Sequence, residues 1–241
     1  MKLLKLSKVL ATIVASSNLL LIAPLKADGV FQPTKLAIDF YEIGLRNSTT
    51  EKLLPVFKND NGVNIDLVSG AGEEELAKGI SLDSTGSYDQ MYVLTSNAPV
   101  ISGNDGKGCY VKAGSYSDND GEWSAATSNV ALAGEATLTE TGFGGSNSDY
   151  GPVSPAVTTY FNGTQTTSLV EYLVNGENKT PGSGGTFNRY LFVGALANSI
   201  DLSKVESGTV WISVETSNTS EMSGLCSVYT WNDTKFTLSI E

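Results

Sequence analysis

Apolar and polar residues alternate along much of the chain, and this period of two is typical of β-strands with one buried face. Alternating apolar positions occur in four short runs, Leu36–Phe40, Val63–Leu67, Val210–Val214 and Phe236–Ile240, and Tyr88–Thr95 has the composition of a longer strand. Many short strands separated by loops rich in glycine, asparagine, aspartate and serine predict a β-sandwich or a β-barrel. Because the runs are short and irregular, we expect an all-β fold, an antiparallel β-sandwich with long loops and little helix.

The first run changes phase partway along its length. The alternation of Leu36–Phe40 continues at Ile43 and Leu45, but in the opposite phase. One extra residue in a strand moves every following side chain to the other face of the sheet. The pattern therefore predicts a β-bulge near Tyr41-Glu42.

Local composition also predicts two chain reversals. Asn61-Gly62, a dipeptide favoured in hairpin turns, precedes the run Val63–Leu67 and is expected to be a turn. Leu225–Trp231 is separated from the last strand only by Asn232–Thr234, so the chain is expected to end in a β-hairpin.

Helical signals are few. Glu73–Lys78 is flanked by glycines and could form one helical turn. Thr166–Val174 could form a short helix or another strand, because periodicity alone does not separate the two for a segment of this length.

Residues 1–27 have the order of a secretory signal peptide. The segment begins with lysines and no acidic residue, continues with an apolar stretch from Val9 to Pro24, and ends on the small residue Ala27. We therefore expect a secreted protein in the periplasm, at the cell surface or in the medium, with no transmembrane insertion after cleavage. Residues 28–241 then suit one β-sandwich domain, with Gly142–Pro155 as a place where two lobes could divide.

The composition excludes several kinds of active site. The chain contains no histidine, which rules out a Ser-His-Asp or Cys-His nucleophilic site and a histidine-ligated metal. The net charge is −11, from 15 Lys and Arg against 26 Asp and Glu. A nucleic-acid partner is not expected, because phosphate binding requires clustered lysine and arginine.

The chain has two cysteines, Cys109 and Cys226. Disulfides persist in the oxidising compartments that a signal peptide leads to. An even number of cysteines in an exported chain predicts that these two are paired, and we expect the bond to be structural.

The stretch from Lys35 to Gly103 contains the segments KLAIDFYEIGL, GVNIDLVSG, LAKGISL and TGSYDQMYVLTSNAPVISG, in this order. It resembles a group of exported bacterial β-sandwich domains of unknown function with transthyretin-like topology. The shared features are the pairs Tyr41-Glu42 and Asp66-Leu67 and the opening Gly86-Ser87-Tyr88 of a long strand. The resemblance implies an immunoglobulin-like or transthyretin-like sandwich in an extracellular setting, without an established chemistry.

A second comparison is with fibre subunits that complete their sandwich with a strand from a neighbour. The common features are little helix, one cysteine pair and an extended segment before the first strand, Asp28–Thr34. The analogy rests on architecture, and in it Asp28–Thr34 would be the donated strand.

Two neighbouring features are candidate ligand sites. Asp118, Asp120 and Glu122 bring side-chain oxygens together around Gly121, which suits a hard cation such as Ca²⁺, although turn residues of this kind are more often ordinary hairpin loops. Trp123 could stack on a sugar ring. No other cofactor is expected.

These observations favour a secreted, non-enzymatic structural or adhesive protein of the cell surface or extracellular space, which assembles with itself or with other surface proteins, for example as a fibre subunit. A carbohydrate-binding module that recognises glycans through Trp123 is the first alternative. A glycoside hydrolase that uses two carboxylates, with Glu73–Glu75 as the example in the sequence, is the second.

Overall fold

The computed structural model describes residues 32–66, 86–118, 124–141, 149–152, 157–177, 186–204, 210–216, 220–222, 228–230 and 234–240. These residues form strands and two short 3₁₀ helices, with no α-helix among them, so the expected all-β fold is confirmed. The elements are β1 (Gln32–Arg46), β2 (Leu53–Asp66), β3 (Ser87–Ser96), β4 (Val100–Asn104), β5 (Tyr110–Val111), β6 (Gly114–Asp118), β7 (Ala126–Thr127), η1 (Val130–Leu132), β8 (Ala136–Glu140), β9 (Asp149–Pro152), β10 (Val157–Phe161), β11 (Thr164–Gln165), β12 (Thr167–Val174), β13 (Arg189–Asp201), η2 (Leu202–Lys204), β14 (Val210–Thr216), β15 (Ser220–Met222), β16 (Val228–Thr230) and β17 (Thr234–Ile240).

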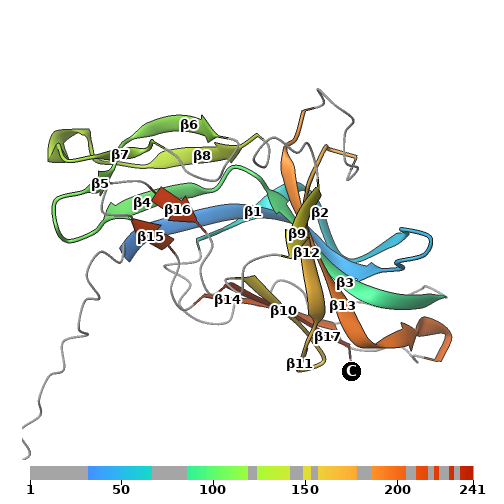
Figure 1. Ribbon diagram of the computed structural model, residues 1–241. Helices are drawn as coiled ribbons and strands as arrows, with labels where there is room; N and C mark the ends of the chain where they lie inside the picture. The colour runs from blue at the N-terminus through green and yellow to red at the C-terminus, as the bar shows by residue number, and fades with distance from the viewer. Residues whose placement is uncertain are drawn as a thin grey trace, which may run out of the picture.

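The strands form two layers. The larger sheet has the order β6-β8-β4-β1-β3-β13-β12-β9, with β2 on the other edge of β1, β5 beside β4, and β7 beside β5. The smaller sheet has the order β11-β10-β17-β14, and β15 pairs with β16. In Figure 1 the smaller sheet lies below the larger one, as the second layer of a sandwich. Most pairings are antiparallel, but β6–β8 and β10–β17 are parallel, so the sheets are mixed.

The predicted bulge in the first strand is confirmed. The register of β1 shifts between Phe40 and Glu42 against both of its neighbours, β2 and β3. Phe40 and Ile43 are both fully buried in the same core cluster. The extra residue therefore lets both halves of β1 direct their apolar positions into one core.

The expected turn at Asn61-Gly62 does not join two strands. Val63 pairs with Phe40 and Lys58 pairs with Glu42. The residues between Lys58 and Val63 therefore loop out of the pairing within β2. The side chain of Asn59 accepts a hydrogen bond from the backbone N–H of Asn61, and Gly62 has a φ of 76°. The turn chemistry is present, but it makes a bulge opposite the bulge of β1.

The larger sheet forks where β3 passes into β4. On the side away from β1, β3 pairs with β13 as far as Ser96 and Arg189, whereas β4 pairs with β8. Asn97 lies at the branch and is only 3% exposed. Its side-chain amide donates to the backbone carbonyls of Glu140, at 2.6 Å, and Phe187, at 3.5 Å. One asparagine thus satisfies carbonyl groups at the point where the two neighbouring strands diverge.

The main core lies between the sheets. Three aromatic side chains meet at its centre: the rings of Phe40 and Phe236 are 5.8 Å apart, and those of Phe192 and Phe236 are 6.0 Å apart. Phe236 belongs to the smaller sheet, and the other two belong to the larger one. Each is fully buried, so the contact of the two layers rests on large apolar side chains.

A glycine in β13 allows a polar contact within this interior. The hydroxyls of Thr159 and Thr166 are hydrogen-bonded to each other and lie against Gly194. A Cβ at Gly194 would collide with both threonine side chains. We expect any larger residue there to separate β10 from the larger sheet.

A second, smaller core lies at the other end of the larger sheet, around β4, β5, β7 and β8. Its buried members are Ile101, Val111, Ala125, Ala136 and Leu138. Cys109, Tyr116 and Ala126 pack against it and are partly exposed.

The ambiguous segment Thr166–Val174 is a strand, β12, over most of its length. The prediction of a C-terminal hairpin is wrong. β16 pairs with β15, whereas β17 pairs with β14 on one side and with β10 on the other. Sequence neighbours often pair, but here β17 is the centre of the smaller sheet and takes partners distant in sequence.

Two predictions concern segments outside the described residues. Glu73–Lys78, the expected helical turn, is one of them. The other is most of Gly142–Pro155, the proposed division between lobes, of which only Asp149–Pro152 is described, as β9 beside β12. A division there stays a prediction.

Candidate functional site

The two ligand sites predicted from the sequence fall largely outside the described residues. Asp118 ends β6, and only its backbone is described. Asp120, Glu122 and Trp123 lie in the undescribed stretch that follows. The Ca²⁺ site and the sugar-stacking tryptophan stay predictions. Within the described part of the chain, no group of three or more acidic or cysteine side chains could hold a metal ion.

A similar acidic loop that is described has the geometry of an ordinary turn. The side chain of Asn104 accepts a hydrogen bond from the N–H of Gly106 at 2.9 Å. The carboxylate of Asp105 accepts from the N–H groups of Lys107, at 2.7 Å, and Cys109, at 2.9 Å. These oxygens are occupied by the backbone of their own loop, as turn chemistry predicts.

Cys109 lies directly after this loop and against the second core. No described cysteine is free. Its expected partner, Cys226, lies outside the described residues, so the pairing of Cys109 with Cys226 stays a prediction.

The bulge of β1 carries a buried polar network. Glu42 is 5% exposed, accepts a hydrogen bond from the hydroxyl of Tyr92 at 2.9 Å, and forms an ion pair with Lys58 at 3.1 Å. Burial, and then the charge of Glu42, raises the pKa of Tyr92 well above its usual range. The hydrogen bonds to Glu42 and Asp60 raise the pKa of Lys58. The network joins β1, β2 and β3, which points to a structural role.

A second polar contact links the bulge to the fork. The guanidinium of Arg189 lies 4.1 Å from the centre of the Tyr41 ring, within the range of a cation–π interaction. Ser96, opposite Arg189 in the strand register, is buried, and its hydroxyl makes no hydrogen bond with any described residue. These residues connect β1, β3 and β13 on one face of the sheet.

Two carboxyl groups, one buried and one half-buried, interact across the fork. Glu140 ends β8 and is 2% exposed. Glu171 is half-buried in β12, opposite Phe192 of β13. Burial, and then the negative charge of Glu140, raises the pKa of Glu171 to about 8. A neutral carboxylic acid at physiological pH is therefore expected within the strand.

Our sequence predictions missed both acids, although the sequence signals them. Glu140 continues the alternation of the buried residues Ala136 and Leu138, which places it on the buried face. Glu171 interrupts the otherwise apolar segment LVEYLV. An acid at an apolar position of a strand pattern is by itself an indication of a buried carboxyl group.

The outer strands differ in how open they are to another strand. β2 contains Pro55, which lacks an N–H, and two register shifts against β1. β6 has five residues, β9 has four and includes Pro152, and β11 has two. Proline, bulges and shortness all hinder the addition of a strand.

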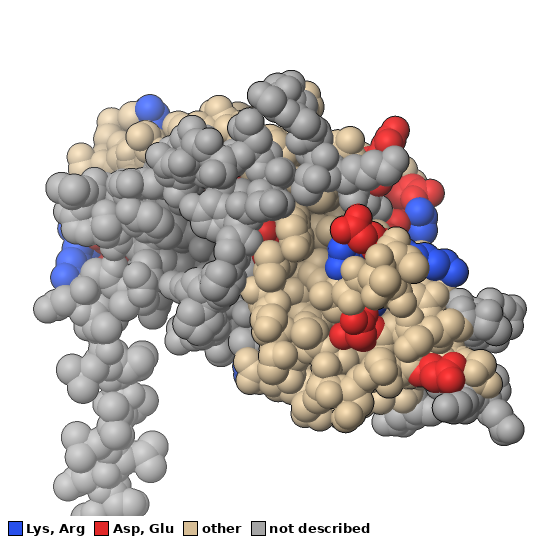
Figure 2. Space-filling model, turned by 45° about the vertical axis from the view of Figure 1, so that its right-hand side comes forward, with Lys and Arg blue, Asp and Glu red and all other residues tan. Residues whose placement is uncertain are grey.

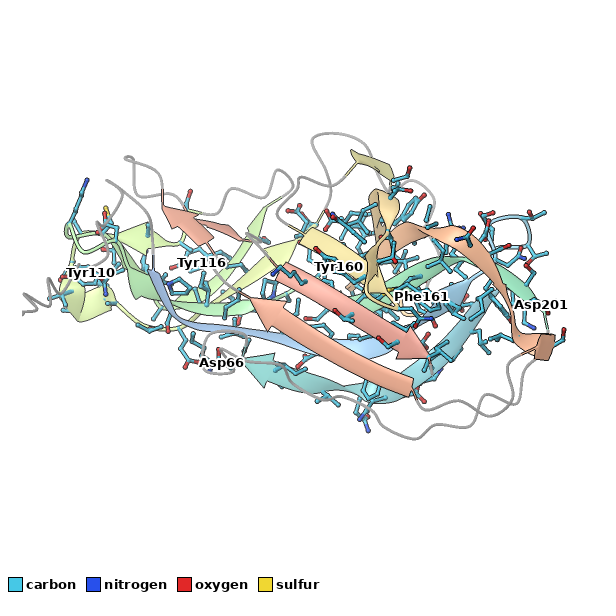
Figure 3. All side chains as sticks on the ribbon, turned by 90° about the horizontal axis from the view of Figure 1, so that it is seen from below. Asp66, Tyr110, Tyr116, Tyr160, Phe161 and Asp201 are labelled. Carbon is cyan, nitrogen blue, oxygen red and sulfur yellow. The ribbon has the colours of Figure 1, made fainter. Side chains whose placement is uncertain are left out.

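β14 has none of these features. It is the outer strand of the smaller sheet, visible from below in Figure 3, and no described strand pairs with its other edge. Its seven residues, Val210–Thr216, pair with β17 from Val210↔Ile240 to Thr216↔Thr234 without a register shift. The sequence VWISVET is rich in β-branched residues and contains no proline or lysine. β14 is therefore the candidate site for strand addition.

Comparison of the chain with family models, curated proteins and solved structures found no match. Helices able to cross a membrane are lacking among the described residues.

Proposed function

We propose that the protein is a secreted, non-enzymatic structural protein of the cell surface or extracellular space that assembles with copies of itself. The observation that carries the proposal is the regular outer edge of β14. A strand edge with unpaired backbone groups is a ready template for another strand, and folded proteins normally obstruct such edges. Residues 1–27, the predicted signal peptide, would direct export of the chain, which supports the extracellular setting.

Strand donation by the N-terminal segment receives less support. Gln32, Pro33 and Thr34 already belong to β1, where Gln32 pairs with Asn104 and Pro33 with Gly103 of β4. The hydroxyls of Thr34 and Ser102 are 2.9 Å apart and hydrogen-bonded. Because part of the expected donor segment is used inside its own sheet, we propose the β14 edge as the site of assembly.

On the face that Figure 2 shows, the charges of the described residues do not oppose self-association. In Figure 2 the acidic and basic side chains on the right of the view are interspersed, and no large patch of one sign is visible among the coloured residues. Interspersed charges of both signs limit the repulsion between two copies at close range.

Carbohydrate binding and glycoside hydrolysis, the two alternative functions, stay predictions. Carbohydrate binding through Trp123 would be tested on a glycan array with Trp123→Ala as the comparison. For a hydrolase, the described acid pair is a poor candidate, because Glu140 is 2% exposed and a polysaccharide could not reach its carboxyl group.

The test of self-assembly is the mass of the mature protein, residues 28–241, measured by light scattering from micromolar to submillimolar concentrations. We expect a mass above that of the monomer, which falls in Ser213→Lys because a charge on an edge strand opposes pairing. Ser239→Lys, on the central strand β17, is the matched control and should keep the assembly. A monomer at every concentration would contradict the proposal.

A further inference from the structure

We infer that β14 pairs with β14 of a second copy, antiparallel, about a two-fold axis through Ser213. The inference rests on the proposed function and names its partner: a second copy of this chain, presenting the same edge. Such a contact closes on itself, so this edge builds a dimer and not a fibre.

The choice of partner follows from the edges that the described chain offers. A strand added to β14 must be about as long and as regular as β14 itself for every backbone group that β14 directs toward its outer edge to pair. β2 is interrupted by Pro55 and by register shifts. The remaining outer strands, β6, β7, β9, β11, β15 and β16, are shorter. Among the described outer strands, only β14 of a second copy has the length and regularity needed to pair with β14.

The register of the pair follows from symmetry. Antiparallel pairing of seven residues with themselves uses every position when the middle residue, Ser213, faces its own copy. Ile212 then faces Val214 of the partner. In β17 these two positions register with Leu238 and Phe236, both fully buried. The smaller sheet would thus continue across the axis with its apolar positions still in line.

An engineered cysteine tests the axis. Residues directly opposite on antiparallel strands have Cβ atoms about 4.5–5.5 Å apart, close to the separation in a disulfide. Ser213→Cys should therefore form a covalent dimer under mild oxidation. Ser239→Cys is the matched control on the central strand β17 and should stay monomeric on a non-reducing gel.

Charge swapping tests the symmetry independently of oxidation. Ser213→Lys and Ser213→Glu should each weaken dimerisation by about fivefold, because each places like charges opposite each other at the axis. Mixing the two variants should restore a dimer containing one chain of each kind. Neither variant is expected to alter the monomer's fold, which circular dichroism would check.

The outcomes separate this inference from the proposed function. A dimer that Ser213→Cys cross-links and the mixed variants restore supports both. Larger assemblies, or a dimer that Ser213→Cys fails to cross-link and mixing fails to restore, overturn the two-fold pairing and leave self-assembly standing. A protein that stays monomeric at submillimolar concentration overturns both.

Discussion

The two cores of the molecule are built differently. The main core lies between two sheets and contains Phe40, Phe192 and Phe236, all fully buried. Among the described residues, the second core, around β4 and β8, has five buried members, two of which are alanines. Because hydrophobic stabilisation grows with the apolar area removed from water, the described residues of the second core contribute much less than those of the first.

The second core is supplemented by contacts of other kinds. Cys109 packs against it, and Asp105 fixes the loop before Cys109 through two backbone hydrogen bonds. Lys35 of β1 forms an ion pair with Glu135, next to β8, at 2.9 Å. This pair is exposed, and pairs of that kind contribute little. We therefore expect the main core to set the stability of the fold and the smaller region to depend on its predicted cross-link.

The largest effect is expected from the main core. Phe236→Ala should lower the free energy of unfolding by about 4 kcal/mol, because it removes the ring that joins the aromatic side chains of both sheets. Leu138→Ala, in the second core, should lower the free energy of unfolding by about 2 kcal/mol. The loss is smaller because the small alanines of this core make fewer contacts with the Leu138 side chain. Denaturant unfolding measures both variants, and equal losses would contradict the comparison.

The predicted cross-link should come next. Cys109→Ala is expected to cost about 3 kcal/mol by releasing a long loop in the unfolded chain. If Cys109 and Cys226 are paired, the double variant should be no less stable than either single one. Hydrogen exchange should show the loss of protection mainly in β4, β5 and β8. Additive effects of the two substitutions would show that the cysteines are not bonded to each other.

Patterns within one strand are readable from the sequence. The phase change between Phe40 and Ile43 predicts the bulge, because side-chain direction depends only on the count of residues along a strand. Asn61-Gly62 is recognisable as turn chemistry, but its place inside β2 depends on the bulge in β1 opposite to it. The fold class is predictable for the same local reason.

Pairing between distant strands is not readable. β17 lies parallel to β10 and central in its sheet, although the nearest strand in sequence is β16. The outer edge of β14, with which no described strand pairs, is a consequence of that order, so no local sequence pattern predicts it. The predicted site at Asp118–Trp123 rests on loop composition alone, which does not separate a ligand site from a turn.

The smallest effect should appear where the two regions meet. Glu140 ends β8, a strand of the second core, and Glu171 lies in β12, which contributes to the main core. The pKa of Glu171 is raised to about 8 from the ordinary value of 4.5. Between these two pH values the folded protein holds a proton that the unfolded chain releases. The contribution of Glu171 to the free energy of unfolding should therefore be largest below pH 4.5. It should decline as the pH rises from 4.5 to about 8.

Glu171→Gln should remove this pH dependence, because glutamine keeps the shape of the neutral acid and cannot ionise. We expect the variant to match the native protein in mild acid and to exceed it by about 2 kcal/mol above pH 8, allowing for the half-buried position of Glu171. Glu177→Gln, at an exposed position after β12, is the matched control and should leave the pH dependence unchanged. Denaturant unfolding across this pH range measures the difference. If Glu171→Gln retained the native slope between pH 4.5 and 8, the carboxyl group of Glu171 would be ionised in the folded protein, and repulsion from Glu140 would not act between the two regions.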